Sequence, residues 1–149
     1  AQVGMSEFAQ RAPHTLSGGQ KQRIGIAGVL AMQPELIVLD EPTSMLDPSG
    51  RMAVMQTLDE LHDAGITLIH ITHSMEEALK AQRMIVMDQG RIVLDDTPQA
   101  VFSQHAEELL EWGLELPVLM ETAHLCKQYG LDVGAGITME EMVNKICQL

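Results

Sequence analysis

The sequence has few cysteines and no long apolar run, and each shortage argues against a class of protein. Cys126 and Cys147 are the only cysteines among 149 residues, and they form no CxxC pair. These counts argue against a disulfide framework or a cysteine-rich zinc site, and we expect two reduced thiols. No run of 18 or more apolar residues occurs, so the sequence predicts no membrane-spanning helix.

Basic residues are also scarce, since nine Lys and Arg stand against 21 Asp and Glu, giving a net charge of −12. That balance argues against nucleic acid or an anionic lipid surface as the main partner. Residues 96–149 hold nine acidic and two basic residues, a net charge of −7. This asymmetry predicts a separate acidic C-terminal unit, although a solvated face is the simpler explanation of most of these charges.

Apolar runs and helix-start signals alternate between residues 16 and 103, which predicts an α/β domain with a mostly parallel sheet. Helices are expected at 18–31, 48–64 and 75–82 and from 98, strands at 36–39 and 66–71, and a hairpin at 84–87 and 91–94. The run 36–39 is continuously apolar, as in a strand buried on both faces. Amphipathic helices at 117–129 and 138–146, the second opened by a capping box at Thr138, predict a small C-terminal helical extension.

The five residues Leu16-Ser17-Gly18-Gly19-Gln20 open the first of these helices and have the properties of an anion site. The two glycines permit a ligand to approach the backbone, and the free N–H groups and the helix dipole attract phosphate. Ser17 adds a hydroxyl donor. Ser-Gly-Gly alone would fit an ordinary turn before a helix, but the complete string followed by Lys21-Gln22-Arg23 is far more specific.

Two acidic residues, Asp40 and Glu41, follow the strand 36–39, at the end where open α/β sheets bind ligands. Asp40 is suited to holding Mg²⁺, and Glu41 to orienting or deprotonating a water. Two solvated acids in a turn would explain the pair equally well. His73 follows the strand 66–71 and is able to hydrogen-bond a phosphate, although a lone histidine at a strand end is usually structural.

Three motifs in order resemble those of ABC ATPases: LSGGQKQR at 16–23, LIVLDEPTSMLDP at 36–48 and ITHSMEEA at 71–78. They match the signature, the Walker B strand with its catalytic glutamate, the D-loop and the H-loop of that family. The resemblance implies that residues 1–105 are the C-terminal part of an ABC ATPase domain with a P-loop NTPase fold. Residues 106–149 would then be an acidic helical extension that helps to pair two ATPase subunits.

The resemblance also implies roles for the signature and the D-loop. Ser17, Gly18, Gly19 and Gln20 would bind ATP, with the first three contacting the γ-phosphate of the nucleotide held by a partner subunit. Asp47, in the D-loop Ser44–Asp47, would couple the two ATP sites across the dimer. Most family members have Ala where Met45 stands, a departure that should not affect the chemistry.

The remaining motifs would serve the nucleotide of the same subunit. Asp40 would position Mg²⁺, Glu41 would polarise the attacking water, and His73 would hydrogen-bond the γ-phosphate. None of the 12 glycines is followed by Lys, so the Walker A motif G-x-x-x-x-G-K-[ST], which wraps the phosphates, is absent from these residues. We therefore expect a piece of a longer subunit that is inactive by itself.

Within the ABC ATPases, the stretches 11–14, 97–102, 113–117 and 122–125 resemble the energy-coupling factor and cobalt importers. That resemblance implies uptake of vitamins, cobalt or nickel, and a position at the cytoplasmic face of the membrane. It also implies a second ATPase subunit, identical or different, and integral membrane transporter subunits, with no nucleic acid partner. Two alternatives remain open: a soluble ABC ATPase of DNA repair or translation, and a non-catalytic dimerisation module.

Overall fold

The computed structural model describes residues 3–131, 133–134 and 139–147 of the chain. It divides into two compact units, Ala1–Thr72 and His73–Leu149, each of which is described by itself. We refer to them as the N-terminal and C-terminal units. No helix in the described part of the chain is long and apolar enough to cross a membrane.

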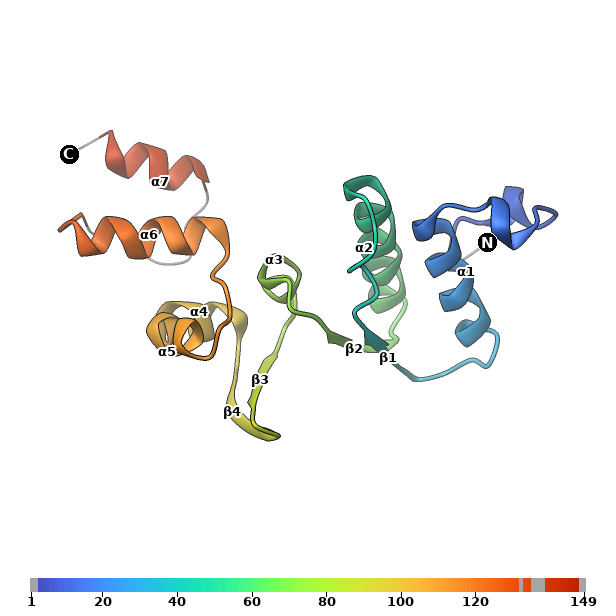
Figure 1. The fold of residues 1–149 in the computed structure, drawn as a ribbon, viewed down its shortest axis with the longest axis horizontal. Helices are drawn as coiled ribbons and strands as arrows, with labels where there is room; N and C mark the ends of the chain where they lie inside the picture. The colour runs from blue at the N-terminus through green and yellow to red at the C-terminus, as the bar shows by residue number, and fades with distance from the viewer. Residues whose placement is uncertain (1–2, 132, 135–138, 148–149) are drawn as a thin grey trace. The chain divides into compact units, whose positions relative to one another are not determined.

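The N-terminal unit combines a two-stranded parallel sheet with two long helices (Figure 1). Its elements are η1 (Ser6–Phe8), η2 (Pro13–Thr15), α1 (Gly18–Leu30), β1 (Leu36–Asp40), α2 (Pro48–Asp63) and β2 (Thr67–Ile71). The strands pair in register from Leu36 opposite Thr67 to Asp40 opposite Ile71. The parallel strand–helix–strand unit predicted from the alternation of apolar runs is therefore confirmed.

Both long helices begin at residues whose side chains cap the first turn. Ser17 Oγ accepts a hydrogen bond from the Gln20 N–H, and the Gln20 side chain accepts one from the Ser17 N–H, which completes a capping box at α1. Asp47 caps α2 by accepting the Gly50 N–H, and Pro48 stands at the first helical position. These caps fix where each helix starts. The predicted signature residues lie at the start of α1, and Asp47 of the predicted D-loop lies at the start of α2.

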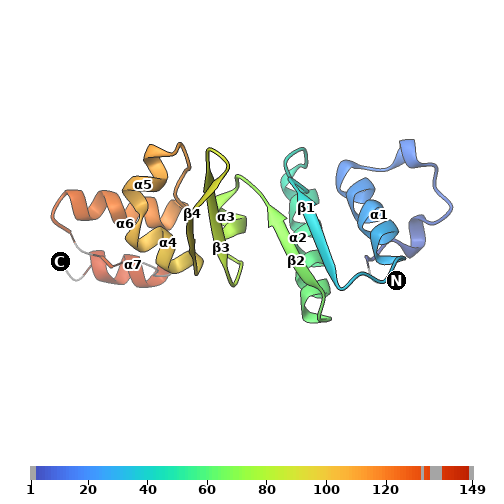
Figure 2. The ribbon, with the colours of Figure 1, turned by 90° about the horizontal axis from the view of Figure 1, so that it is seen from below.

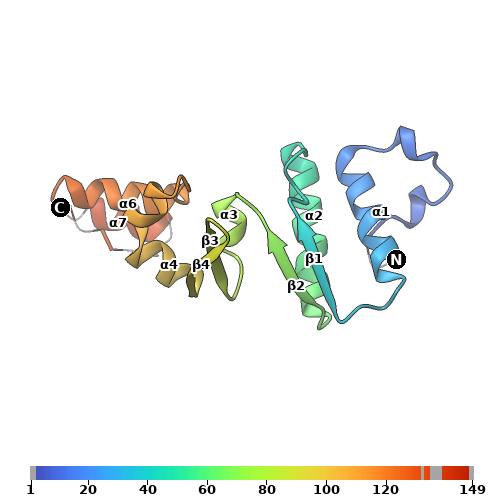
Figure 3. The same cartoon turned by 60° about the horizontal axis from the view of Figure 1, so that its bottom comes forward.

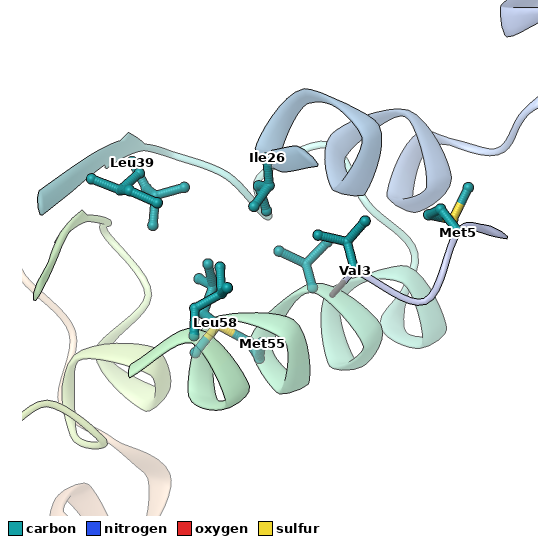
Figure 4. Packing of buried hydrophobic residues seen from close by; sticks show 9 residues of the cluster. Val3, Met5, Ile26, Leu39, Met55 and Leu58 are labelled. Carbon is teal, nitrogen blue, oxygen red and sulfur yellow. The ribbon is translucent and has the colours of Figure 1, made fainter. Parts of the chain in front are cut away.

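One hydrophobic core joins α1, α2 and a single face of the sheet. Figure 4 shows Ile26 of α1, Leu39 of β1 and Leu58 of α2 directed towards one another, with Val3 and Met5 at the same core. On α2, Val54, Leu58 and Leu61 are almost completely buried. Their spacing of three to four residues produces the buried stripe that holds the helix to its neighbours.

The opposite face of the β1–β2 sheet is not covered. Leu36 and Val38 are 47% and 56% exposed, and Ile69 and Ile71 are 46% and 49% exposed. Figure 3 shows β1 and β2 side by side, with α2 along one face. The expectation that the strand 36–39 is buried on both faces is therefore wrong for this chain, because α1 and α2 cover only the face that carries Ile37 and Leu39.

The C-terminal unit is a β-hairpin with helices packed against it (Figure 2). Its elements are α3 (Met75–Ala78), β3 (Met84–Asp88), β4 (Arg91–Asp96), α4 (Pro98–Gln104), α5 (Ala106–Glu111), α6 (Val118–Gln128) and α7 (Met139–Ile146). The predicted hairpin is confirmed as an antiparallel pair. The Arg83 guanidinium holds it with two hydrogen bonds to the Asp95 carboxylate, and these bonds lower the pKa of that carboxyl.

Some local predictions for this unit differ from the structure. The helix expected at 75–82 ends at Ala78, and Ser74 makes no side-chain capping bond to it. The short helix α5 was not predicted. The capping residue Thr138 lies outside the described residues. The core of the unit includes Val86, Leu109 and Met120, and the domain boundary near residue 105 stays a prediction.

We expect the isolated 149-residue chain to self-associate, because an uncovered apolar sheet face and an open strand edge favour pairing with another chain. Replacing Val38 and Ile69, which are cross-strand partners on the exposed face, with Thr should shift the chain towards monomer. Met52→Thr, at an exposed position on α2, is the matched control and should change little. Light scattering on purified chains measures this, and a stable unsubstituted monomer would contradict the expectation.

Candidate functional site

The start of α1 presents several hydrogen-bond donors, with Ser17 and Gly18 exposed and Gly19 buried. Gly18 and Gly19 occupy the first two positions of the helix, where the helix itself provides no carbonyl for the backbone N–H groups. Ser17 Oγ accepts the Gln20 N–H at 3.3 Å, and its hydroxyl proton can still be donated. We call Ser17–Gly19 the phosphate cap, because two N–H groups and one hydroxyl at a helix N-terminus fit phosphate oxygens.

The phosphate cap lies against the D-loop and the start of α2. A Cβ placed on Gly18 would lie 2.9 Å from Leu46 Cδ2, and one placed on Gly19 would lie 2.9 Å from the Gly50 Cα. Asp47, the fourth residue of the D-loop, is exposed and caps α2. The structure therefore brings the predicted signature and D-loop residues together on one side of the N-terminal unit.

Asp40 and Glu41 lie at the carboxyl end of β1, as predicted. The Glu41 N–H donates to the Ile71 carbonyl at 2.9 Å, so the strand pairing extends to this residue. Glu41 has a φ of +48°, a conformation uncommon for residues other than glycine and often found at functional sites. Its carbonyl oxygen accepts from the Ser44 N–H and the Ser44 hydroxyl, which tightens the turn into the D-loop.

The donor set at the end of β1 fits the magnesium ion that the sequence resemblance implies. Asp40 is exposed and Glu41 is half-buried. Mg²⁺ is commonly held through one or two carboxylates together with phosphate oxygens and water. Within the residues that the structure describes, no three His, Cys, Asp or Glu side chains gather to hold a metal.

His73 is the one predicted site residue outside the N-terminal unit. It follows β2 by two residues, is exposed and opens the C-terminal unit. Its proposed contact with the γ-phosphate, and its position relative to Asp40 and Glu41, stay predictions.

Sequence reasoning missed two residues that contact the phosphate cap, Leu46 and Gly50. Gly50 stands in the first turn of α2, where the sequence shows only a glycine that destabilises a helix relative to alanine. Gly25 and Gly28 share that property without a close contact, so the sequence alone does not single out Gly50. The contact of Leu46 with Gly18 has no sequence signal either, because it joins segments 28 residues apart with no shared pattern.

Comparisons with known proteins agree with these motifs. The family model described as "ABC transporter" matches residues 1–44, which include the phosphate cap and the end of β1. The chain is 53% identical over 149 residues to the energy-coupling factor transporter ATP-binding protein EcfA1 of Clostridium perfringens, an alignment that covers 99% of this chain. It is also 53% identical over 148 residues to EcfA1 of Caldanaerobacter subterraneus.

The chain belongs to the ABC transporter family. Its structure resembles that of cbiO1 from Clostridium perfringens, part of the ABC transporter complex cbiONQ, with a TM-score of 0.66 and 37% identity. That match covers 83% of this chain and 49% of cbiO1. The chain spans about half the length of the curated relatives it matches, 53% in the case of the C. perfringens protein.

We expect Ser17→Ala to lower the free energy of unfolding by about 1 kcal/mol, because it removes the side-chain acceptor of the α1 cap. Ser17→Asn is the matched control, since it keeps an acceptor at the same position and should retain most of the stability. Denaturant unfolding of the complete subunit measures both. Equal stability of the alanine variant and the unsubstituted protein would show that the capping box contributes nothing.

Proposed function

We propose that the chain is part of an ATP-binding subunit of an energy-coupling factor transporter, and that the complete subunit hydrolyses ATP to drive uptake. The observation that carries this proposal is the 53% identity to EcfA1 across nearly the whole chain. The ordered signature, Walker B, D-loop and H-loop residues support it, because they are the residue types that ATP hydrolysis requires. The complete subunit would have the layered P-loop NTPase fold.

The phosphate cap would bind the nucleotide of a second ATPase subunit. Its two N–H groups and the Ser17 hydroxyl are donors only towards a ligand that approaches from outside the helix start. Gln20 holds the cap in shape through its bond to the Ser17 N–H, and its side-chain amide group provides a further donor. Such fixed donors stabilise charge on phosphate oxygens without reorganising during the reaction.

Asp40, Glu41 and His73 would act on the nucleotide of their own subunit. Mg²⁺, when bound with ATP, neutralises charge on the phosphate oxygens. Asp40 would hold that ion through its exposed carboxylate. Glu41 would orient a water and accept its proton, and its turn, fixed by bonds to Ile71 and Ser44, keeps the carboxylate at the end of β1. His73 would donate a hydrogen bond to the γ-phosphate.

The partners follow from the same assignment. We propose a second ATPase subunit, identical or different, and integral membrane subunits, with the protein at the cytoplasmic face of the membrane. Vitamins, cobalt and nickel are the candidate substrates, because the sequence resembles the energy-coupling factor and cobalt importers at residues 11–14, 97–102, 113–117 and 122–125. Residues 106–149 would help to pair the ATPase subunits, and the net charge of −12 disfavours nucleic acid.

In the complete transporter, Glu41→Gln should slow ATP hydrolysis by roughly 10²–10⁴-fold, the range for a lost general base. Glu35→Gln is the matched control: Glu35 is an exposed acid just before the opposite end of β1, and its replacement should leave the rate unchanged. Steady-state phosphate release measures both variants. An unchanged rate in Glu41→Gln would remove Glu41 from the mechanism.

The isolated 149-residue chain should show no micromolar affinity for ATP, because these residues contain no Walker A motif to wrap the phosphates. Isothermal titration calorimetry with MgATP tests this, using the complete subunit as the positive control. Micromolar binding by the isolated chain would contradict the division of the ATP site proposed here. Retained pairing without any nucleotide binding would be the behaviour of a dimerisation module.

A further inference from the structure

The starts of α1 and α2 approach each other so closely that two glycines meet. A Cβ on Gly19 would lie 2.9 Å from the Gly50 Cα and 3.3 Å from the Gly50 carbonyl oxygen. Real Cβ atoms do not approach backbone at the shorter distance, and backbone atoms cannot turn aside as the end of a side chain can. The start of α1 can therefore accept no side chain at residue 19 unless one of the two helices moves. Gly19 is buried by this contact.

Gly50 is constrained on a second side by the D-loop. A Cβ there would lie 2.8 Å from Asp47 Oδ1, the atom that caps α2 by accepting the Gly50 N–H. It would also meet Leu46 Cβ at 3.5 Å and the Gly19 Cα at 3.6 Å. One added methyl group at residue 50 would thus displace the Asp47 carboxylate that caps α2, while its distances to Leu46 and Gly19 would be those of ordinary van der Waals contact.

Two other glycines of α1 show that this packing is local. A Cβ on Gly25 or Gly28 would meet nothing within 4 Å. Glycine destabilises a helix by about 1 kcal/mol relative to alanine. At residue 19 the neighbouring backbone excludes a side chain, and at residue 50 the Asp47 carboxylate opposes one, whereas nothing opposes one at residues 25 and 28. The close contact is confined to the end of α1 that carries the phosphate cap.

We infer that Gly50 and Leu46 are positioning residues that hold the phosphate cap and the D-loop as one rigid surface. Gly50 fixes the distance between the two helix starts, and Leu46 rests on Gly18. A shift of about 1 Å in a positioned group can reduce a rate by about 10²-fold, so the N–H groups of residues 18 and 19 need such a fixed support. The inference rests on the proposed function, because it concerns the reaction assigned to the complete transporter.

The primary test compares Gly50→Ala with Gly28→Ala in the complete transporter, measuring kcat, the KM for MgATP and the thermal unfolding midpoint. Gly50→Ala should lower kcat by roughly 10- to 100-fold, while the KM and the midpoint change little. Gly28→Ala should leave kcat and KM near their original values and should raise the midpoint slightly, because alanine is the better helix former. A normal kcat in Gly50→Ala would overturn the inference. So would a parallel loss of kcat, MgATP affinity and thermal stability, which indicates a merely structural role.

A rescue experiment tests the Leu46 contact independently. Gly18→Ala forces a methyl group against Leu46 Cδ2, the flexible end of a side chain, and Leu46→Ala removes that atom. Each single variant should lower kcat, and the double variant should recover part of that loss, because the methyl group at residue 18 then occupies the space that Leu46 Cδ2 leaves and restores the contact. No recovery would overturn the inference, and this pair decides alone if Gly50→Ala does not fold.

The failure of the inference is distinguishable from the failure of the proposed function. A transporter whose unsubstituted form shows no ATP hydrolysis would contradict the proposed function itself. Normal hydrolysis by the unsubstituted form, combined with a normal kcat in Gly50→Ala, would contradict only the positioning roles.

Discussion

The N-terminal unit depends on the packing of α2, whose buried stripe of Val54, Leu58 and Leu61 ties the helix to the sheet and to α1. Burying a side chain of this size stabilises a fold by about 1.5–3 kcal/mol, so these three residues are a large part of the free energy of a small unit. Because α2 connects β1 to β2, its position also fixes the turn that carries Glu41 and the D-loop. The positions of Glu41 and the D-loop therefore depend on this one helix.

The same helix links the two halves of the proposed chemistry. The D-loop lies between the end of β1 and the start of α2, and the phosphate cap rests on that start through the Gly19–Gly50 contact. A displacement at Asp40 or Glu41 would therefore reach the phosphate cap over a few residues of tightly turned backbone. Packed contacts between rigid elements of this kind can carry energetic coupling between two sites.

Much of the local structure could be predicted from the sequence because the signals are local. Capping residues predict two helix starts, at Ser17 and at Asp47-Pro48. A turn sequence, Asp88-Gln89-Gly90, predicts the hairpin. The helix α5 was missed because it has no side-chain cap. The uncovered face of β1 was also missed, because an apolar run reports that burial is favourable and says nothing of which segment provides the cover.

In the candidate site, too, local features could be predicted from the sequence and long-range packing could not. The motif residues could be recognised one by one, since each has a chemical type suited to phosphate, magnesium or water. The distances between these residues could not be predicted, because the packing of α1 against α2 sets them. The glycines that permit this packing carry no side chain that would form a pattern.

The uncovered face of β1–β2 and the phosphate cap are two surfaces of different character. One is apolar and suited to burial against further strands or helices, and the other is polar and suited to a nucleotide. Changes to the apolar face should act on folding and association. Changes at the phosphate cap should in addition act on the reaction, because its donors face the nucleotide as well as capping α1.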